Sequence, residues 1–377
     1  MAKKKKEIHI LLNKERQELA RRYEKEKRLL GLGSSLWSLI LGLTFYSSGL
    51  SSWLSNSALR NSLAGTFFLY VFSFLALFFF CTFPLNFYSS YIHEHKWNFS
   101  NQTVKSWLWE QAKSFFVSLI ILIVLLGLLL SIMAKFAQLW WLIAGLSMAL
   151  ISVLFATITP VLILPIFNKY TPIQNKELID ALGKILSRGG LRSSGFFKED
   201  MSRQTKKENA FLAGLGKTRR VILADNLMEN MTIPEIESII AHEVGHFKHR
   251  HIWKTIALGT IEELAVFYII DLAMKALFPQ FLFSVRSNLT LFPVFAILLG
   301  GVSGFLFGPF RKVISRHFEK QADFYALKNI EDKKAFTTAL AGLADRNLSN
   351  AYPDWWVKIL YYSHPPIGER LQRVENI

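Results

Sequence analysis

The residues best suited to chemistry in this sequence are His242-Glu243-Val244-Gly245-His246. On an α-helix, residues four apart lie on one face, so His242 and His246 can both direct a ring nitrogen at one metal ion. Glu243 is turned about 100° from His242 around the helix axis. Its carboxylate can therefore reach a water molecule beside the metal without binding the metal itself. Two histidine ligands and one glutamate base are the pattern of a zinc site that activates water.

A zinc site of this kind needs a third protein ligand and leaves a fourth position open. Glu319 is a candidate for that ligand, in the stretch SRHFEKQADFYALKN. Asp323 follows four residues later on the same face of an expected helix, where it can accept a hydrogen bond from a ligand histidine and fix its tautomer. Taken alone, two acids at this spacing more often form a solvated helix face. Together with the histidine motif, they favour metal binding.

The histidine motif lies on a predicted helix with a clear start. Thr232 is a suitable N-cap, Pro234 fits the first turn, and Glu235 completes a capping box. No helix breaker follows before the apolar stretch that begins near Ile252. We therefore expect the helix to run into that stretch without interruption.

The segment before this helix predicts a small α/β unit. Residues 176–190 have the apolar spacing of a helix and end on a glycine pair. Three short candidate strands follow, in GFFKEDMS, NAFLAGLG and RRVILADNL, separated by turns rich in lysine or containing glycine. We expect 167–251 to form one folded segment that carries the histidine motif.

The rest of the chain is too apolar for an ordinary soluble protein, since 51% of its 377 residues are hydrophobic and they occur in blocks. About twenty apolar residues suffice to cross a bilayer. Six such spans are expected, at 34–54, 63–88, 115–134, 139–166, 252–278 and 289–310. The third and fourth are joined by a few residues, which predicts an antiparallel hairpin. The single cysteine, Cys81, excludes a disulfide framework within the chain.

The positive charge of the chain, +16 in total, lies between these apolar blocks. Lysine and arginine are frequent in 1–33, 89–114, 167–251 and 311–377, and rare in the three remaining connections. The positive-inside rule then places both termini and the folded segment on the cytoplasmic side, and the charge does not indicate nucleic-acid binding. The first segment, 1–33, is either a helix along anionic headgroups or a solvated tail.

Two further histidines, His249 and His251, follow the motif. No acidic residue follows at a spacing suited to metal binding, and Lys248 and Arg250 stand beside them. We expect both histidines to lie at the membrane surface, where the helix would enter the bilayer.

Three acids occur within the span expected at 252–278, namely Glu262, Glu263 and Asp271. Acids inside a membrane are costly and usually face a polar interior. They indicate either a hydrated cavity or pairing, with one another or with Lys254 and Lys275.

With these motifs in view, the sequence resembles a known family. AHEVGH together with SRHFEKQAD is similar to the integral-membrane zinc metalloproteases that include the CAAX prenyl endopeptidases (Ste-type) and HtpX. The stretches FSNQT, LPIFNKYTPI, NAFLAGLGKTRRVILADNL and SHPPIGERLQRV resemble segments of the CAAX prenyl protease branch. The similarity runs from about residue 85 to the C-terminus.

The resemblance implies a metal site residue by residue. One zinc ion per chain would be bound by His242, His246 and Glu319. Glu243 would act as base and then as acid, and Asp323 would accept a hydrogen bond from one of the ligand histidines.

The resemblance also implies residues that meet the substrate. Asn209, Ala210 and Phe211 correspond to the edge strand that would hold the substrate backbone. His364 and Arg370 correspond to a pair near the scissile carbonyl, where a cation and an imidazole can stabilise an oxyanion. Taken alone, the stretch around His364 would be the turn before a helix.

These features predict an α-helical polytopic membrane protein of about six transmembrane helices with a cytoplasm-facing, zincin-like α+β metalloprotease domain. Its expected order is a basic helix (1–33), four spans (34–166), a catalytic segment (167–251), two spans (252–310) and a C-terminal catalytic part (311–377).

The expected activity is that of a zinc endopeptidase similar to the CAAX prenyl proteases. Its expected partners are the lipid bilayer and a peptide or protein substrate, with or without a prenyl group. General quality control of membrane proteins, as in HtpX, is one alternative. A zinc-binding membrane scaffold or transporter without catalysis is another.

Overall fold

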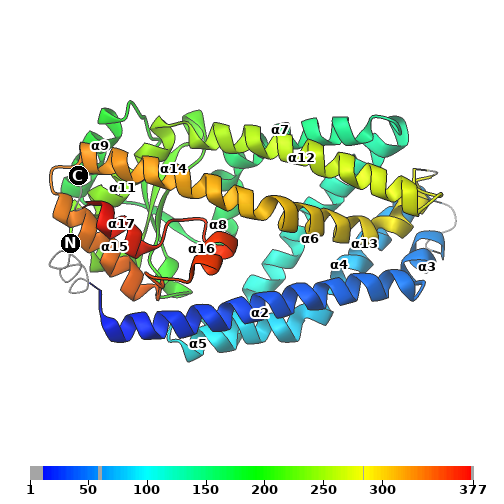
Figure 1. The fold of residues 1–377 in the computed structure, drawn as a ribbon, viewed down its shortest axis with the longest axis horizontal. Coiled ribbons are helices and arrows are strands. Elements are labelled where there is room, and N and C mark those ends of the chain that lie inside the picture. Colours follow the sequence, from blue (N-terminus) through cyan, green and yellow to red (C-terminus); the bar gives the residue numbers. More distant parts are fainter. Residues whose placement is uncertain (1–11, 58–61, 283, 375–377) are drawn as a thin grey trace.

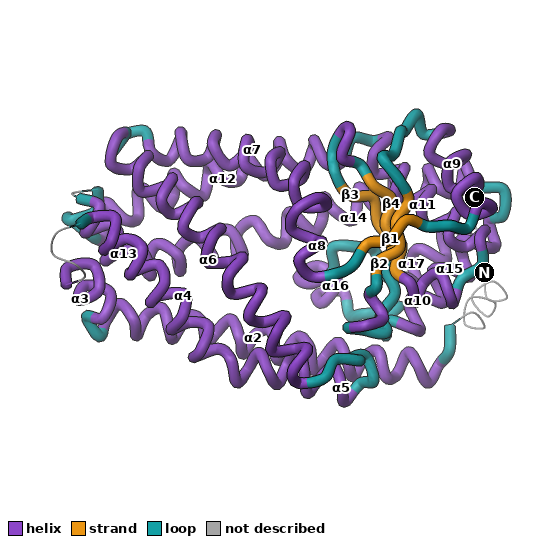
Figure 2. The backbone as a smooth tube through the Cα atoms, turned by 180° about the vertical axis from the view of Figure 1, so that it is seen from behind, coloured by secondary structure: helices purple, strands orange, loops and turns teal. Residues whose placement is uncertain are grey.

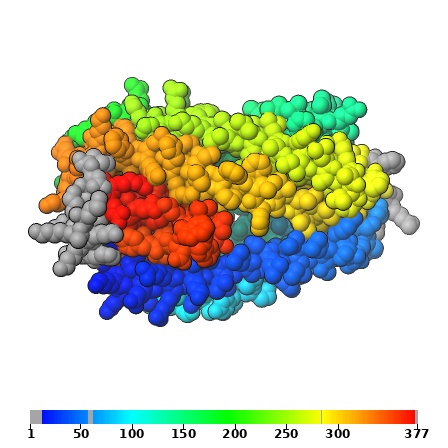
Figure 3. Space-filling model, in the orientation of Figure 1, coloured from blue at the N-terminus to red at the C-terminus, as the bar shows by residue number. Residues whose placement is uncertain are grey.

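The structure is a computed structural model, and it describes residues 12–57, 62–282 and 284–374. The molecule is elongated, as its space-filling outline shows (Figure 3). Long helices form a bundle at one end, and a small sheet with shorter helices forms the other, called the sheet end below (Figure 1). Residues 1–11 of the predicted basic segment and residues 375–377 lie outside the described residues.

Long apolar helices build the bundle. They are α2 (Lys14–Ser47), α3 (Leu50–Ser57), α4 (Leu63–Phe87), α6 (Val104–Lys135), α7 (Trp140–Ile158), α12 (His251–Leu277) and α13 (Val285–Gly301). Five helical stretches of the described residues are long and apolar enough to cross a membrane: Lys14–Ser47, Leu63–Lys96, Val104–Lys135, Trp140–Phe167 and Val285–Asn329. Large apolar side chains on these helices stay exposed, for example Leu150 at 76%. The protein is thus a multi-pass membrane protein.

Five of the six predicted spans overlap these stretches. The remaining one, predicted at 252–278, is the 27-residue helix α12, which lies beside α7 (Figures 1 and 2). Its charged side chains lower its hydropathy, which sets it apart from the five apolar stretches. The boundary predicted at residue 33 carries no break in the backbone, because α2 is helical from Lys14 to Ser47.

The sheet end is built on four strands in the order β1 (Tyr170–Pro172), β2 (Phe196–Glu199), β4 (Arg220–Ala224) and β3 (Ala210–Ala213) (Figure 2). The β2 and β4 strands run parallel, and both outer pairs are antiparallel. The three predicted strands are therefore present, while β1 is too short to show a sequence pattern. Among the described strands β3 pairs only with β4, so no strand covers its outer edge.

Helices α9 (Lys176–Arg188), α11 (Ile233–Lys248), α15 (Lys333–Arg346) and α17 (Ile367–Val374) enclose the core of this end. Fully buried side chains such as Leu182, Leu223 and Ile240 each contribute about 1.5–3 kcal/mol. Helix α11 also packs closely on α14 (Gly308–Asn329). A Cβ atom added to Gly245 would lie 2.9 Å from the Cα of Ala322. Two small residues thus let the helix of the histidine motif approach the helix of the candidate third ligand.

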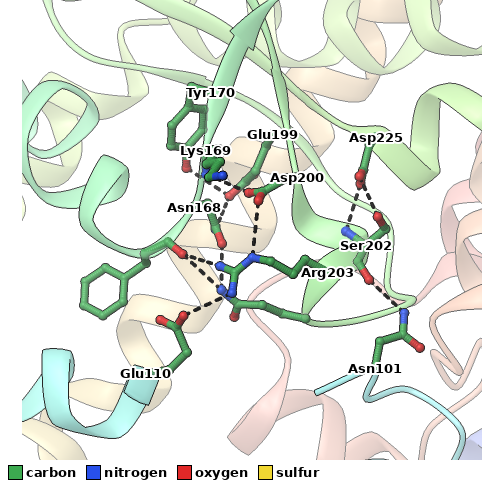
Figure 4. Close-up of polar contacts among 12 residues, drawn as sticks. Asn101, Glu110, Asn168, Lys169, Tyr170, Glu199, Asp200, Ser202, Arg203 and Asp225 are labelled. Carbon is green, nitrogen blue, oxygen red and sulfur yellow. Dashed lines mark hydrogen bonds and ion pairs between the residues drawn. The ribbon is translucent and has the colours of Figure 1, made fainter. Parts of the chain in front are cut away.

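Polar side chains join the sheet to the membrane helices (Figure 4). Arg203, which follows β2, donates a hydrogen bond to the carbonyl of Phe167 at 2.7 Å and lies 3.3 Å from Glu110 Oε1 of α6. Asn101 donates to the carbonyl of Ser202 at 2.8 Å. The position of the sheet relative to the bundle is therefore set by several side chains at once.

The N-terminal helix α2 also reaches the sheet end (Figure 1). Tyr23 donates to Glu94 Oε1 at 2.7 Å, and Lys207 donates to the other oxygen of Glu94 at 2.6 Å. Tyr362 donates to Glu24 Oε2 at 2.6 Å. The described part of the basic segment is thus a helix packed on protein rather than a solvated tail.

Two of the three acids in α12 have partners in the structure. Trp140 Nε1 donates to Asp271 Oδ1 at 2.6 Å, and Lys275 donates to Asp271 Oδ2 at 2.7 Å. Glu262 pairs with Arg311 and accepts from Ser303 Oγ at 3.0 Å. The alternative of pairing is confirmed for Asp271 and Lys275, whereas the pairing of Glu262 with Arg311 lay outside the prediction.

Candidate metal centre

The histidine motif lies on α11 as predicted, and its helix begins with the expected cap. The backbone N–H of Thr232 donates to Glu235 Oε2 at 2.9 Å, which forms the capping box. Helix α14 carries Glu319 across from the motif. One ligand atom from each of His242, His246 and Glu319 lies within 4.8 Å of the other two. The three predicted ligands therefore meet at one point, although His246 and Glu319 are 73 positions apart in the sequence.

The surroundings of Glu319 fit a cation. The carboxylate is 4% exposed, and its oxygens lie 3.1 Å from His242 Nε2 and 3.3 Å from His246 Nε2. Oε2 is buried without a hydrogen bond of suitable geometry. A buried carboxylate oxygen in this state is costly unless a cation compensates it. Two imidazole nitrogens and one carboxylate oxygen are a donor set that zinc accepts.

The second ring nitrogen of His242, Nδ1, contacts a buried ion pair formed by Asp323 and Arg370. Asp323 Oδ1 lies 2.9 Å from His242 Nδ1, so the carboxylate can fix the tautomer that leaves Nε2 free for a metal. Arg370 holds Asp323 through two hydrogen bonds, from Nε to Oδ2 at 3.0 Å and from Nη2 to Oδ1 at 2.6 Å. The structure thus places Asp323 where the sequence predicted it. It places the Arg370 guanidinium on Asp323, with Nη2 3.5 Å from His242.

The second ring nitrogen of His246, Nδ1, contacts a different residue, His251. The two Nδ1 atoms are 3.0 Å apart, and His251 Nε2 lies 2.8 Å from Gln321 Oε1. His251 is 4% exposed, so the prediction that it lies at the membrane surface is wrong. His249 is only partly buried, and among the described residues no hydrogen bond joins it to a ligand, so its predicted place at the surface stays a prediction.

The cause of this difference is a break in the helix. Arg250 adopts a left-handed conformation with φ 55°, which ends α11 and starts α12 at His251. The predicted uninterrupted helix is therefore wrong. On a continuous helix, His251 would be turned about 140° from His246, because five residues cover 500°. The left-handed conformation of Arg250 brings the ring of His251 back to His246. No local sequence pattern predicts this conformation.

Glu243 directly follows the ligand His242, and its carboxylate accepts a hydrogen bond from the backbone of Leu212 in the edge strand. Loss of hydration raises the pKa of its carboxyl group above the ordinary value, while the charges of His242 and His246 and the backbone of Leu212 act in the opposite direction. A raised pKa suits a group that must accept a proton and then give it back.

A cavity of about 470 Å³ opens beside these residues. Its walls come from α2, β3, α11, α15 and the segment around α16 (Trp355–Tyr361) and α17. Of the predicted site residues it is lined by His242, Glu243, Asn209, Ala210, His364 and Arg370. Phe211 lies on the same edge strand but outside this lining. His364, in the turn between α16 and α17, has Nε2 3.2 Å from Glu319 Oε1. The cavity therefore combines one candidate metal ligand, His242, with the carboxylate of Glu243, the edge strand and an imidazole, while His246 and Glu319 lie outside its lining.

Two family models match consecutive parts of the chain. The N-terminal model, described as CAAX prenyl protease N-terminal, five membrane helices, matches residues 2–169. The model of peptidase family M48 matches residues 172–377.

Two curated proteins and one solved structure are similar over most of the chain. The uncharacterized metalloprotease YhfN of Bacillus subtilis is 31% identical, over 74% of this chain and 66% of its own. CAAX prenyl protease 1 of Saccharomyces cerevisiae is 30% identical, over 78% of this chain and 68% of its own. The chain thus spans about two thirds of these relatives. The crystal structure of S. mikatae Ste24p matches with a TM-score of 0.83 and 26% identity, covering 96% of this chain and 89% of that one.

These matches agree with the geometry of the site and indicate a metalloendopeptidase. Both the membrane bundle and the sheet end are covered, and the relatives favour one branch. The chain belongs to peptidase family M48, in the branch of the CAAX prenyl proteases.

Proposed function

We propose that this protein is a zinc endopeptidase that cleaves prenylated or membrane-associated proteins at the cytoplasmic face of a membrane. The observation that carries the proposal is the meeting of His242, His246 and Glu319 beside a cavity that is lined by His242, Glu243 and the start of the edge strand. The prenylated substrate is suggested by the name of the yeast relative. The cytoplasmic face is suggested by the excess of lysine and arginine in the segments that form the sheet end.

The substrate backbone would bind to the outer edge of β3. An extended peptide can add to a free edge as a further strand, with main-chain hydrogen bonds that do not depend on its sequence. Asn209 and Ala210 lie where this edge meets the cavity, and the backbone of Leu212 is next to Glu243. A peptide on this edge would therefore pass the carboxylate of Glu243 at its scissile bond.

Glu243 would move the proton in the reaction. His242, His246 and Glu319 would hold a zinc ion, which supplies a Lewis acid that lowers the pKa of water and polarises a carbonyl. The carboxylate of Glu243 would take a proton from the attacking water and deliver it to the nitrogen of the leaving amine. Its raised pKa suits both halves of this transfer.

His364 and Arg370 would have separate roles. The side chain of His364 is 62% exposed and belongs to the wall of the cavity, so its imidazole can donate a hydrogen bond to the oxyanion. The Arg370 guanidinium already makes two hydrogen bonds to Asp323. We therefore assign Arg370 to positioning Asp323 and His242, and His364 to contact with the substrate.

A cleavage assay with matched peptides tests the proposal. One peptide carries a farnesylated C-terminal CAAX sequence, the second has the same sequence without the lipid, and each is assayed with and without a zinc chelator. We expect chelator-sensitive cleavage that is faster for the farnesylated peptide. Equal cleavage of both peptides would favour general quality control of membrane proteins. A protein that binds zinc without cleaving either peptide would be a scaffold or transporter.

A further inference from the structure

A second cavity, of about 440 Å³, lies at the junction of α11 and α12. It is lined by two arginines and four apolar residues: Leu215, Arg219, Phe247, Arg250, Ile252 and Trp253. None of these residues lines the cavity of the metal centre. We call this second cavity the junction pocket. The proposed peptidase reaction gives it no role.

The junction pocket lies at the level where the bundle meets the sheet end. The turn between β3 and β4 brings Leu215 and Arg219 to the pocket, and Arg220 directly after it donates to the carbonyl of Pro160 at 3.2 Å. Pro160 belongs to the π-helical turn Thr159–Ile163, where the helix of α7 leaves the bundle. From the other side, α12 starts at His251 and enters the bundle. The pocket therefore faces the boundary between water and lipid.

The side chains around the pocket suit this boundary. Trp253 is 51% exposed and Ile252 is 38% exposed, directly after the break at Arg250. Tryptophan is enriched where membrane proteins cross the headgroup layer, because its ring is apolar and its N–H is polar. The apolar part of the pocket can therefore contact the glycerol and the first methylenes of a lipid.

The two arginines carry positive charge that no described carboxylate neutralises. No ion pair of Arg219 or Arg250 occurs among the described residues. The Arg219 guanidinium lies over the ring of Phe247, 4.3 Å from its centroid, which fixes it at the pocket wall. Burial lowers the pKa of Arg219, and no acid contributes in the other direction. An anion in this pocket would meet two guanidinium groups without competition.

We propose that the junction pocket binds the phosphate of an anionic membrane lipid. Guanidinium groups form paired, charge-assisted hydrogen bonds with phosphate oxygens. An anionic headgroup keeps its net negative charge, whereas in phosphatidylcholine the choline cation offsets the charge of the phosphate. Basic pockets on the cytoplasmic side of membrane helices have this chemistry. The apolar half of the lining and the level of the pocket favour a lipid over a soluble phosphate. The bound lipid would connect the β3–β4 turn, and with it the edge strand, to the start of α12.

Lipid binding to the full-length protein in detergent tests the proposal. Short-chain phosphatidylglycerol and phosphatidylcholine with the same acyl chains are titrated separately, and binding is followed by the shift in thermal unfolding. We expect phosphatidylglycerol to raise the unfolding temperature more than phosphatidylcholine does. Arg219→Gln and Arg250→Gln should each weaken the binding of phosphatidylglycerol about tenfold. Arg219→Lys, which keeps the charge, should weaken it less.

Lys217→Gln is the matched control, because Lys217 lies on the same turn, is exposed, and does not line the pocket. Its variant should bind phosphatidylglycerol as the wild type does. Equal binding by the wild type and both Arg→Gln variants overturns the proposal, and so does an equal loss in Lys217→Gln. The same shift with inorganic phosphate alone would assign the pocket to a soluble anion.

Assays with a water-soluble peptide separate this proposal from the peptidase proposal. In lipid-free detergent, Arg219→Gln should leave the KM for the peptide unchanged. A higher KM would assign the pocket to the substrate and overturn lipid binding. Lipid binding can be measured whether or not the protein cleaves any peptide, so the two proposals fail independently.

Discussion

Buried charges are arranged differently in the two ends of the molecule. At the sheet end, they converge: Glu319 lies near His242, His246 and His364, and Asp323 ties His242 to Arg370. In the bundle, they form small closed groups. Among the described residues, Asp271 bonds to Lys275 and to Trp140.

This difference indicates how each end responds to substitution. In the convergent group, each polar side chain orients another that would hold the metal or move a proton. Substituting one of them should therefore change metal binding or the rate of cleavage. In the closed groups of the bundle, a substitution leaves one or two hydrogen-bonding partners unsatisfied, and it should not affect residues outside the group. The first kind of change should alter activity and metal binding, and the second should alter stability.

The largest expected effect is that of Glu243→Gln. The amide cannot take a proton from water, so the rate of cleavage should fall by a factor of about 10²–10⁴ or more. Zinc content should stay at one per chain, because Glu243 is not among the three ligands. Metal analysis and peptide cleavage on the same preparation check both statements. Substantial proteolysis by the variant would refute the assigned role of Glu243.

A smaller effect is expected from His251→Leu, which removes the ring behind His246. Substitutions of this kind lower metal affinity about 10–100-fold. Titration of zinc with a competing chelator measures the change without any substrate. His249→Leu is the matched control, because His249 stacks on His251 at 5.5 Å but has no described bond to a ligand. Equal losses in both variants would mean that packing, and not orientation of His246, matters at this turn.

The pH dependence of cleavage should reflect Glu243. Burial raises the pKa of this carboxyl group, so its protonated form, which cannot act as a base, persists to higher pH than for an exposed glutamate. Going down in pH, kcat/KM should fall about tenfold per pH unit once the pH is below that raised pKa. The onset should lie above pH 4.5, the ordinary value for glutamate. A rate that stays constant down to that pH would contradict the assignment.

The smallest effect on chemistry is expected from Asp271→Leu in the bundle. The N–H of Trp140 loses its acceptor in a buried position, which should cost about 1–3 kcal/mol of stability. Thermal unfolding in detergent measures this loss, while kcat and zinc content should stay within twofold of the wild type. Lys275→Met serves as comparison, since the Lys275 side chain is 44% exposed and should matter less. A large fall in kcat for Asp271→Leu would show that the two ends are coupled.

The ligand set was predictable because each half of it lies on one helix. His242 and His246 are four residues apart on α11, as are Glu319 and Asp323 on α14, and helical spacing alone places each pair on one face. His251 was not predictable in this way. Its approach to His246 depends on a left-handed Arg250, a conformation that arginine rarely adopts and that no neighbouring residue announces.

The bundle shows a related limit. Hydropathy located the spans, but it could not show that the polar residues before Ser34 continue the same helix. Their contacts, such as Tyr23 with Glu94 and Glu24 with Tyr362, join residues 71 and 338 positions apart. A local pattern carries no information on partners that are so distant in sequence.

Helix α2 has a mechanical consequence. Its 34 residues form one rod about 50 Å long, and both ends are fixed: Gln17 is bonded to the backbone of Ala351, and Phe45 is buried in the bundle. Inserting one residue near its middle would rotate one end by about 100° relative to the other and lengthen the rod by about 1.5 Å. The length of α2 therefore sets the distance between the bilayer and the peptide-binding edge. In a membrane of a different thickness, the helix would have to tilt.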